Sequence, residues 1–203
     1  MSGPHIVIIG GPNGAGKSTT APSIVRDLLG VSVFVNADTI AQGLAAFDPA
    51  GSAIEAGRIM LRRLDELARR RADFSFETTL SSRHYARWID ARKVEGYHIH
   101  LVYLWLHSSE QALARVAERV GRGGHSIPDT VVRRRYERGI VNLFRLYLPR
   151  VDSWYVFDSS TSGAPRLIAA RHPDGREAIL DVETWKRMGE AIDESGQDPR
   201  SAE

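Results

Sequence analysis

The sequence contains no cysteine, which excludes disulfides and thiolate metal sites and suits a reducing compartment. Lysine is scarce as well, with three lysines against 24 arginines. A membrane span needs about 20 consecutive apolar residues, and the longest apolar run, Ile99–Leu106, is far shorter. The charged and apolar regions of a secretion signal are also missing, because a strand-like stretch already begins at Ile6. We therefore expect a cytoplasmic protein without membrane contact.

The charge balance gives no support for a nucleic-acid partner. The net charge is +2 over 203 residues, which is too small to attract a polyanion by itself. The arginine excess is typical of a G+C-rich genome, although the planar guanidinium also suits phosphate oxygens. Hydrophobic residues at 42% and charged residues at 26% are ordinary for a globular protein. A chain of this length is sufficient for one well-packed domain.

Short apolar stretches alternate with helical ones as far as Asp158. Most of these stretches are continuously apolar, as expected for parallel strands buried on both faces. The five predicted strands are Ile6–Gly10, Val33–Asn36, Phe74–Glu77, His98–Leu106 and Trp154–Asp158. The predicted helices span about 18–28, 52–72, 83–95, 109–121 and 128–148. This alternation predicts a three-layer α/β fold with a mainly parallel, five-stranded sheet.

The C-terminal part follows a different pattern. Arg166–Ala170 and Ala178–Asp181 flank an Asp-Gly turn, which indicates an antiparallel hairpin over about 166–181. A short helix is predicted over Val182–Met188, and the polar residues 189–203 are expected to be disordered. Because no compositional break separates these parts, we expect a single domain over residues 1–188.

A glycine-rich segment follows the first predicted strand and matches the phosphate-binding pattern G-x-x-x-x-G-K-[ST]. Glycines allow backbone N–H groups to surround phosphate oxygens, and the following helix adds its positive N-terminal end. Lys17 is predicted to reach the β- and γ-phosphates, and the Ser18 hydroxyl to bind Mg²⁺. The predicted nucleotide-binding residues are Gly11, Pro12, Asn13, Gly14, Ala15, Gly16, Lys17, Ser18 and Thr19.

Acidic and hydroxyl side chains follow the second and third predicted strands. Asp38 could take a proton from an acceptor hydroxyl, hold Mg²⁺ through water, or cap a helix beginning at Thr39. Glu77, Thr78 and Thr79 end the third strand in "FETTL", at the edge of the sheet where open α/β sheets bind ligands. They could bond a polyhydroxy substrate or the water shell of magnesium, and Thr79 or Ser81 could instead cap the next helix.

Arginines lie on both sides of the Gly123-Gly124 pair, over about 115–138. Arg115, Arg119 and Arg122 share one helical face by their spacing. After the glycines come Arg134, Arg135 and Arg138. The arrangement favours a lid that neutralises charge on a transferring phosphate, and its alternative is a solvated basic face. The sequence offers no cluster of histidines and carboxylates for a structural metal.

Four segments together resemble the zeta-toxin family of P-loop kinases: "GGPNGAGKST", "NAD", "FETTL" and "RVGRGGHSIPDTVVRRRYERGIVNL". The resemblance extends from about Ile6 to Asp158. It implies a kinase that transfers the γ-phosphate of ATP to a sugar hydroxyl, that of UDP-N-acetylglucosamine in the family's characterised members. It also implies a partner protein, an antitoxin, that restrains the enzyme.

By this resemblance, Asp38 is the catalytic base, and Glu77 and Thr79 contact the substrate. Arg122 and Arg135 are the expected phosphate-binding arginines, and Arg119 and Arg134 are close alternatives. Arg119 is also grouped with the ATP-binding residues. Arg134 and Arg138, together with Thr78, are grouped with the substrate. Asp158 and the two serines after it fall where such kinases pass near the adenine.

Three other functions remain open at this stage. The acceptor could be another small hydroxyl compound or a polynucleotide 5′ end, which the arginines could also serve. The chain could also be a nucleotide-dependent switch that works through a partner without transferring phosphate. The absence of an N-K-x-D stretch, which would read guanine, favours adenine.

Overall fold

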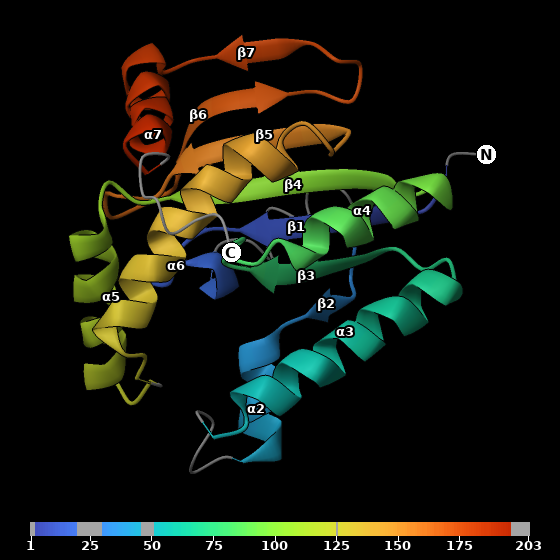
Figure 1. Ribbon diagram of the computed structural model, residues 1–203, viewed down its shortest axis with the longest axis horizontal. Coiled ribbons are helices and arrows are strands. Elements are labelled where there is room, and N and C mark those ends of the chain that lie inside the picture. The colour runs from blue at the N-terminus through green and yellow to red at the C-terminus, as the bar shows by residue number, and fades with distance from the viewer. Residues whose placement is uncertain (1–2, 20–29, 46–50, 125, 196–203) are drawn as a thin grey trace.

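The computed structural model describes residues 3–19, 30–45, 51–124 and 126–195. Its strands form one sheet with the order β2-β3-β1-β4-β5-β6-β7 (Figure 1). The strands are β1 (His5–Gly10), β2 (Phe34–Val35), β3 (Phe74–Thr78), β4 (His98–Trp105), β5 (Ser153–Asp158), β6 (Arg166–Arg171) and β7 (Glu177–Ile179). The first five are parallel, which confirms the predicted sheet. The predicted hairpin, formed by β6 and β7, extends the same sheet by antiparallel pairing. The sheet therefore has seven strands, whereas the prediction was a five-stranded sheet with a hairpin.

The helices largely follow the predicted pattern. They are α2 (Ala37–Leu44), α3 (Ala53–Arg69), α4 (His84–Val94), α5 (Ser109–Gly121), α6 (Asp129–Asn142), a π-helical turn η1 (Leu143–Tyr147), and α7 (Val182–Ser195). The expected helix over 18–28 lies mostly outside the described residues. The sequence named a helix in this place only as the one beginning at Thr39 that Asp38 could cap, and α2 begins two residues earlier, at Ala37. The long helix predicted to 148 divides into α6 and η1. None of the described helices is long and apolar enough to cross a bilayer.

The C-terminal helix is longer than the sequence predicted. It continues past Met188 to Ser195, so the first part of the expected disordered tail is helical. Trp185 stacks on Trp154 of β5 with an interplanar angle of 6°, and Met188 is fully buried. This packing explains how a mostly polar segment is held against the sheet. Residues 196–203 lie outside the described part of the chain.

Two apolar clusters cover the two faces of the sheet. Along β1, Ile6 and Ile8 belong to the cluster that includes residues of α3 and α4, whereas Val7 and Ile9 belong to the cluster under α5. All four side chains are fully buried. Successive residues of a strand point to opposite faces, so a strand covered on both sides must be apolar throughout. The three-layer prediction is therefore confirmed (Figure 1).

Helix α6 and η1 hold the segment that follows β3. A Cβ on Gly139 would lie 2.7 Å from the Thr79 carbonyl oxygen, so a larger residue would push the two apart. The Asn142 amide donates to the Leu80 carbonyl at 2.8 Å. The Tyr147 hydroxyl donates to the Ser82 carbonyl. These contacts fix the end of β3 at the edge where the parallel strands terminate.

Candidate active site

The glycine-rich loop lies against the end of β4 and the side of α5. Gly11, Gly14 and Gly16 have φ values of 143°, 80° and 81°, which favour glycine. A Cβ on Gly11 would lie 2.4 Å from the Leu104 carbonyl oxygen, and one on Gly14 would lie 2.9 Å from Arg115 Cβ. Conformation thus favours glycine at all three positions, and space requires it at Gly11 and Gly14.

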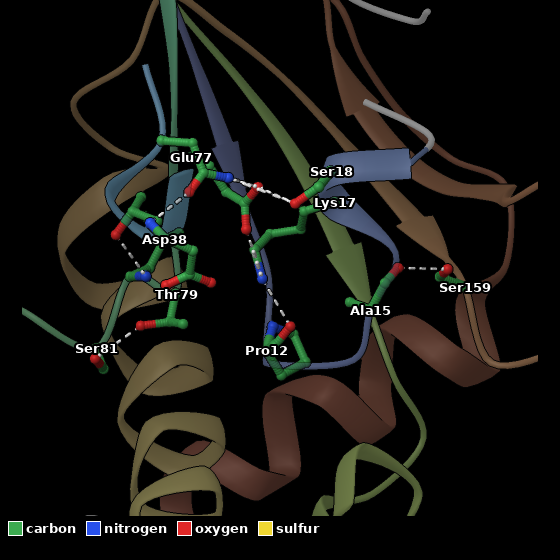
Figure 2. A network of polar contacts seen from close by, with 12 residues as sticks. Pro12, Ala15, Lys17, Ser18, Asp38, Glu77, Thr79, Ser81 and Ser159 are labelled. Carbon is green, nitrogen blue, oxygen red and sulfur yellow. Dashed lines mark hydrogen bonds and ion pairs between the residues drawn. The ribbon is translucent and has the colours of Figure 1, made fainter. Parts of the chain in front are cut away.

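Lys17 is buried at the end of this loop (Figure 2). Its Nζ donates to the Pro12 carbonyl at 2.8 Å and lies 3.6 Å from Glu77 Oε1. Burial lowers the pKa of Lys17, while the Glu77 and Asp38 carboxylates oppose that shift. The loop therefore presents an ammonium group whose charge is partly balanced by carboxylates from β3 and from the first turn of α2.

Glu77 links the glycine-rich loop to Asn36, the residue that follows β2, by hydrogen bonds. Its Oε2 accepts hydrogen bonds from the Ser18 hydroxyl at 2.7 Å and from the Asn36 amide at 2.8 Å. Asn36 Oδ1 in turn accepts from the backbone N–H groups of Asp38 and Thr39, at 2.7 and 3.3 Å. Asn36 is therefore the N-cap of α2, and the alternative that Asp38 caps this helix is wrong. The side chain of Asp38 is left for another role.

The residues present fit a nucleotide with magnesium. The Ser18 hydroxyl and the Glu77 carboxylate are oxygen donors of the kind that Mg²⁺ prefers, and Mg²⁺ commonly takes only one or two protein ligands beside substrate phosphates. Within the described residues no group of three or more acidic or histidine side chains could hold a metal alone. Asn13 Oδ1 is buried and has no hydrogen-bond partner among the described residues, so the loop contains an acceptor that an N–H or O–H group of a ligand could satisfy.

A cavity of about 170 Å³ opens beside Lys17. One wall is polar and comes from the loop and the strand ends. The other wall comes from Gly57 and Met60 of α3 and Tyr85 of α4, with the Tyr85 hydroxyl 3.9 Å from Met60 Sδ. Burial raises the pKa of Tyr85 to about 12, so the phenol stays protonated. The full lining is Asn13, Lys17, Asn36, Ala37, Asp38, Gly57, Met60, Glu77, Thr78, Thr79, Tyr85 and Arg135.

The predicted arginines separate into two groups. Arg135 is half-buried and lines the cavity, and its pKa is lowered by burial while Asp38 opposes the shift. Arg119 is half-buried and close enough to Lys17 to contribute to lowering its pKa. In contrast, Arg122 is exposed at the C-terminal end of α5. The structure likewise leaves Arg134 and Arg138 exposed on α6, away from the cavity lining.

The two predicted threonines have local partners. Thr78 Oγ1 accepts from the Leu80 N–H at 3.2 Å, and Thr79 Oγ1 lies 2.9 Å from Ser81 Oγ. Helix α4 begins only at His84, so the alternative that Thr79 or Ser81 caps it is wrong. Both threonines line the cavity.

The segment after β5 packs on the loop from outside the cavity. Asp158 accepts from the Ser160 N–H at 2.8 Å and from Arg166 at 3.2 Å. The Ser159 hydroxyl donates to the Ala15 carbonyl at 2.9 Å (Figure 2). Arg115 donates to the Ser160 carbonyl at 2.9 Å. The prediction that this segment passes near adenine stays a prediction.

The parallel sheet, the glycine-rich loop with Lys17, and an adjoining cavity with a carboxylate and a guanidinium define a P-loop kinase. The comparisons then give the family. The family model described as Zeta toxin matches residues 2–151, so the chain belongs to the zeta toxin family. The resemblance carried by the sequence motifs is thus confirmed, and the chain has the fold of a P-loop kinase.

Relatives and solved structures agree with this placement. A Haemophilus influenzae protein, described as uncharacterized, is 32% identical over 126 residues, which are 62% of this chain and 88% of that protein. The crystal structure of AvrRxo1-ORF1:AvrRxo1-ORF2 with sulphate ions matches with a TM-score of 0.75 and 18% identity, over 92% of this chain and 63% of the matched chain. The PezAT toxin-antitoxin system of Streptococcus pneumoniae matches with a TM-score of 0.61 and 15% identity, over 96% and 87%.

A further crystal structure of the AvrRxo1 complex contains ATP. It matches with a TM-score of 0.72 and 17% identity, over 92% of this chain and 64% of the matched chain. This chain therefore spans less than two thirds of the matched AvrRxo1 chain. At this identity the likeness establishes the fold, and the acceptor and partner have to be argued from the site.

Proposed function

We propose that this chain transfers the γ-phosphate of ATP to a hydroxyl group of a sugar, with UDP-N-acetylglucosamine as the first candidate acceptor. The single observation that supports this most is that Lys17, Asp38 and Arg135 line the same small cavity. A carboxylate able to take a proton and a guanidinium able to neutralise phosphate charge then face the site where the loop would place the γ-phosphate.

In the proposed reaction, the acceptor hydroxyl oxygen forms a bond to the γ-phosphorus as the bond to the β,γ-bridging oxygen breaks. Asp38 accepts the proton of that hydroxyl, and ADP leaves with the bridging oxygen. Lys17, Arg135 and Arg119 offset the negative charge on the transferring group. When bound, Mg²⁺ would be held by Ser18, with Glu77 beside it, and would neutralise charge on the phosphates.

The cavity suits a sugar ring as acceptor. Its volume of about 170 Å³ accommodates about one monosaccharide unit rather than a whole nucleotide sugar. Thr78, Thr79 and Glu77 can bond ring hydroxyls, and the Tyr85 ring offers an apolar wall. The family resemblance supports UDP-N-acetylglucosamine. The likeness to the PezAT toxin-antitoxin system supports an antitoxin protein as partner. A nucleotide-sugar substrate and such a partner are consistent with the expected cytoplasmic location.

The test is phosphate transfer from γ-labelled ATP to UDP-N-acetylglucosamine, N-acetylglucosamine and a 5′-hydroxyl oligonucleotide. We expect label in the nucleotide sugar, and none when Lys17→Met replaces the wild type. Label in the oligonucleotide alone, lost steeply with added salt, would assign a polynucleotide acceptor. ATP binding without transfer to any acceptor would favour the nucleotide-dependent switch.

Gly57 gives a test of where the acceptor lies. It lies in the second turn of α3, inside the helix, where glycine costs roughly 0.5–1 kcal/mol relative to alanine, and a Cβ there would meet no described atom within 4 Å. Gly57→Leu should therefore fold and project into the cavity. We expect the KM for the acceptor to rise at least about tenfold, with the KM for ATP unchanged, in steady-state kinetics.

Gly43 on α2 supplies the matched control. It is also helical and without a described atom within 4 Å of an added Cβ, but it does not line the cavity. Gly43→Leu should leave both KM values unchanged. An unchanged KM for the acceptor in Gly57→Leu would contradict the proposal that the acceptor binds in this cavity.

A further inference from the structure

A second cavity, of about 490 Å³, lies between α4 and η1. We name it the α4 groove, and its lining is Arg83, His84, Ala86, Arg87, Leu146 and Arg150. Three of these six residues are arginines and a fourth is a histidine, whereas no carboxylate lines it. The helices that border it cover the same face of the sheet (Figure 1). Nothing in the proposed transfer reaction uses these residues.

Ion pairing explains only one of the three arginines of the α4 groove. Arg150 is paired with Asp90 at 3.2 Å and donates to the Leu146 carbonyl at 2.8 Å. Arg83 and Arg87, however, form no ion pair within the described residues. They are four residues apart at the start of α4, where like charges repel and destabilise a helix. An anion between them would relieve that repulsion.

The beginning of α4 adds to the positive character of the groove. The helix starts at His84, whose N–H donates to Ser82 Oγ at 3.1 Å, and the N-terminal end of a helix favours anions. The Tyr147 hydroxyl donates to the Ser82 carbonyl, so η1 fixes this turn in place. The backbone turn that carries Arg83 and His84 is therefore fixed by a contact with η1.

The first turn of α4 also separates the two cavities. Tyr85 lines the acceptor cavity, and the residues directly before and after it line the α4 groove. The α4 groove is therefore a neighbour of the acceptor cavity across the first turn of α4.

We propose that the α4 groove binds a phosphate or diphosphate group through Arg83, Arg87 and Arg150. The group is either the diphosphate of the acceptor itself, which rests on the proposed function, or that of a separate small effector. A small ligand is favoured over a nucleic acid because the chain has a net charge of only +2. Arginine suits this ligand because its fork bonds two phosphate oxygens at once.

The first test measures pyrophosphate binding by calorimetry. The loop is blocked beforehand with Mg²⁺ and a non-hydrolysable ATP analogue, so only other sites are observed. The variant carries Arg83→Gln and Arg87→Gln, and the control carries Arg58→Gln and Arg62→Gln, a pair with the same spacing on α3 outside both cavities. We expect the double variant to weaken binding at least about tenfold and the control to leave it unchanged.

Equal pyrophosphate affinity in the wild type and the double variant would overturn the proposal. So would binding of an oligonucleotide, lost in the double variant, without binding of pyrophosphate. Because this measurement involves no transfer, its failure is distinguishable from failure of the proposed kinase activity. Thermal unfolding of each variant shows that the exposed substitutions leave the fold intact.

The second test identifies the source of the phosphate group. If the groove holds the diphosphate of the acceptor, the double variant raises the KM for UDP-N-acetylglucosamine and leaves the rate with free N-acetylglucosamine unchanged. If it holds a separate effector, added pyrophosphate changes the rate with the free sugar in the wild type but not in the double variant. A double variant that matches the wild type in both comparisons contradicts a role of the groove in either form.

Discussion

Asp38→Asn is expected to lower the rate of phosphate transfer by about 10²–10⁴-fold, with ATP affinity changed by less than about twofold. The substitution removes the proton acceptor from the cavity but retains size and polarity. Asn36 still caps α2, because its Oδ1 accepts from the backbone N–H of residue 38 rather than from the side chain. Single-turnover transfer and separate ATP titration measure the two quantities.

Glu55→Gln is the matched control for this substitution. Glu55 lies in the first turn of α3, as Asp38 lies in the first turn of α2, so both changes remove an acidic group near a helix N-terminus. Glu55 does not line the cavity and its replacement should leave transfer unchanged. A joint loss of transfer and of Mg²⁺-dependent ATP binding in Asp38→Asn would instead support the alternative that Asp38 holds magnesium through water.

The nucleotide-binding loop and the central sheet could be predicted because their causes are local. Strands covered on both faces have to be largely apolar, and β1 is fully buried and apolar from Ile6 to Ile9, as β4 is from Leu101 to Trp105. The loop requires glycines at fixed positions, and the register of β1 with β3 then brings Gly10 level with Thr78. The predicted meeting of the glycine-rich loop and "FETTL" follows from this register.

The second wall of the cavity could not be predicted from the sequence. Gly57, Met60 and Tyr85 come from α3 and α4, and nothing in their helical spacing indicates that the two helices meet over the end of β3. Asn36 was overlooked for a different reason. It stands next to the expected acidic residue, and its asparagine side chain is a favoured N-cap that could have indicated α2.

The arginines illustrate a limit of periodicity. Spacing showed which of them share a helical face, but not which face turns toward the cavity. On α6, Arg135 is half-buried and lines the cavity with Asp38, whereas Arg138 is exposed. Likewise Arg119 is half-buried near Lys17, whereas Arg122 at the end of the same helix is exposed. On this geometry we propose Arg119 and Arg135 as the phosphate-binding pair.

Arg135→Met should lower the transfer rate by about 10³-fold or more, the range found when a charge-neutralising arginine is removed from phosphate transfer. The reason is that Arg135 is the cavity-lining guanidinium on α6 and faces the Asp38 carboxylate. Its charge would be needed most in the transition state, so kcat should fall much more than the KM for ATP rises. Steady-state kinetics with both substrates separates the two effects.

Arg138→Met makes the comparison decisive, because this residue lies on the same helix, carries the same charge and is exposed. If the arginines act only as a solvated basic face, the two substitutions should cost about the same and both effects should diminish with added salt. If Arg135 neutralises the transferring group inside the cavity, only its removal lowers kcat, and salt should not equalise the two variants. Comparable losses of kcat in both variants would therefore contradict a specific role for Arg135. They would support the alternative that the α6 arginines form a solvated basic face.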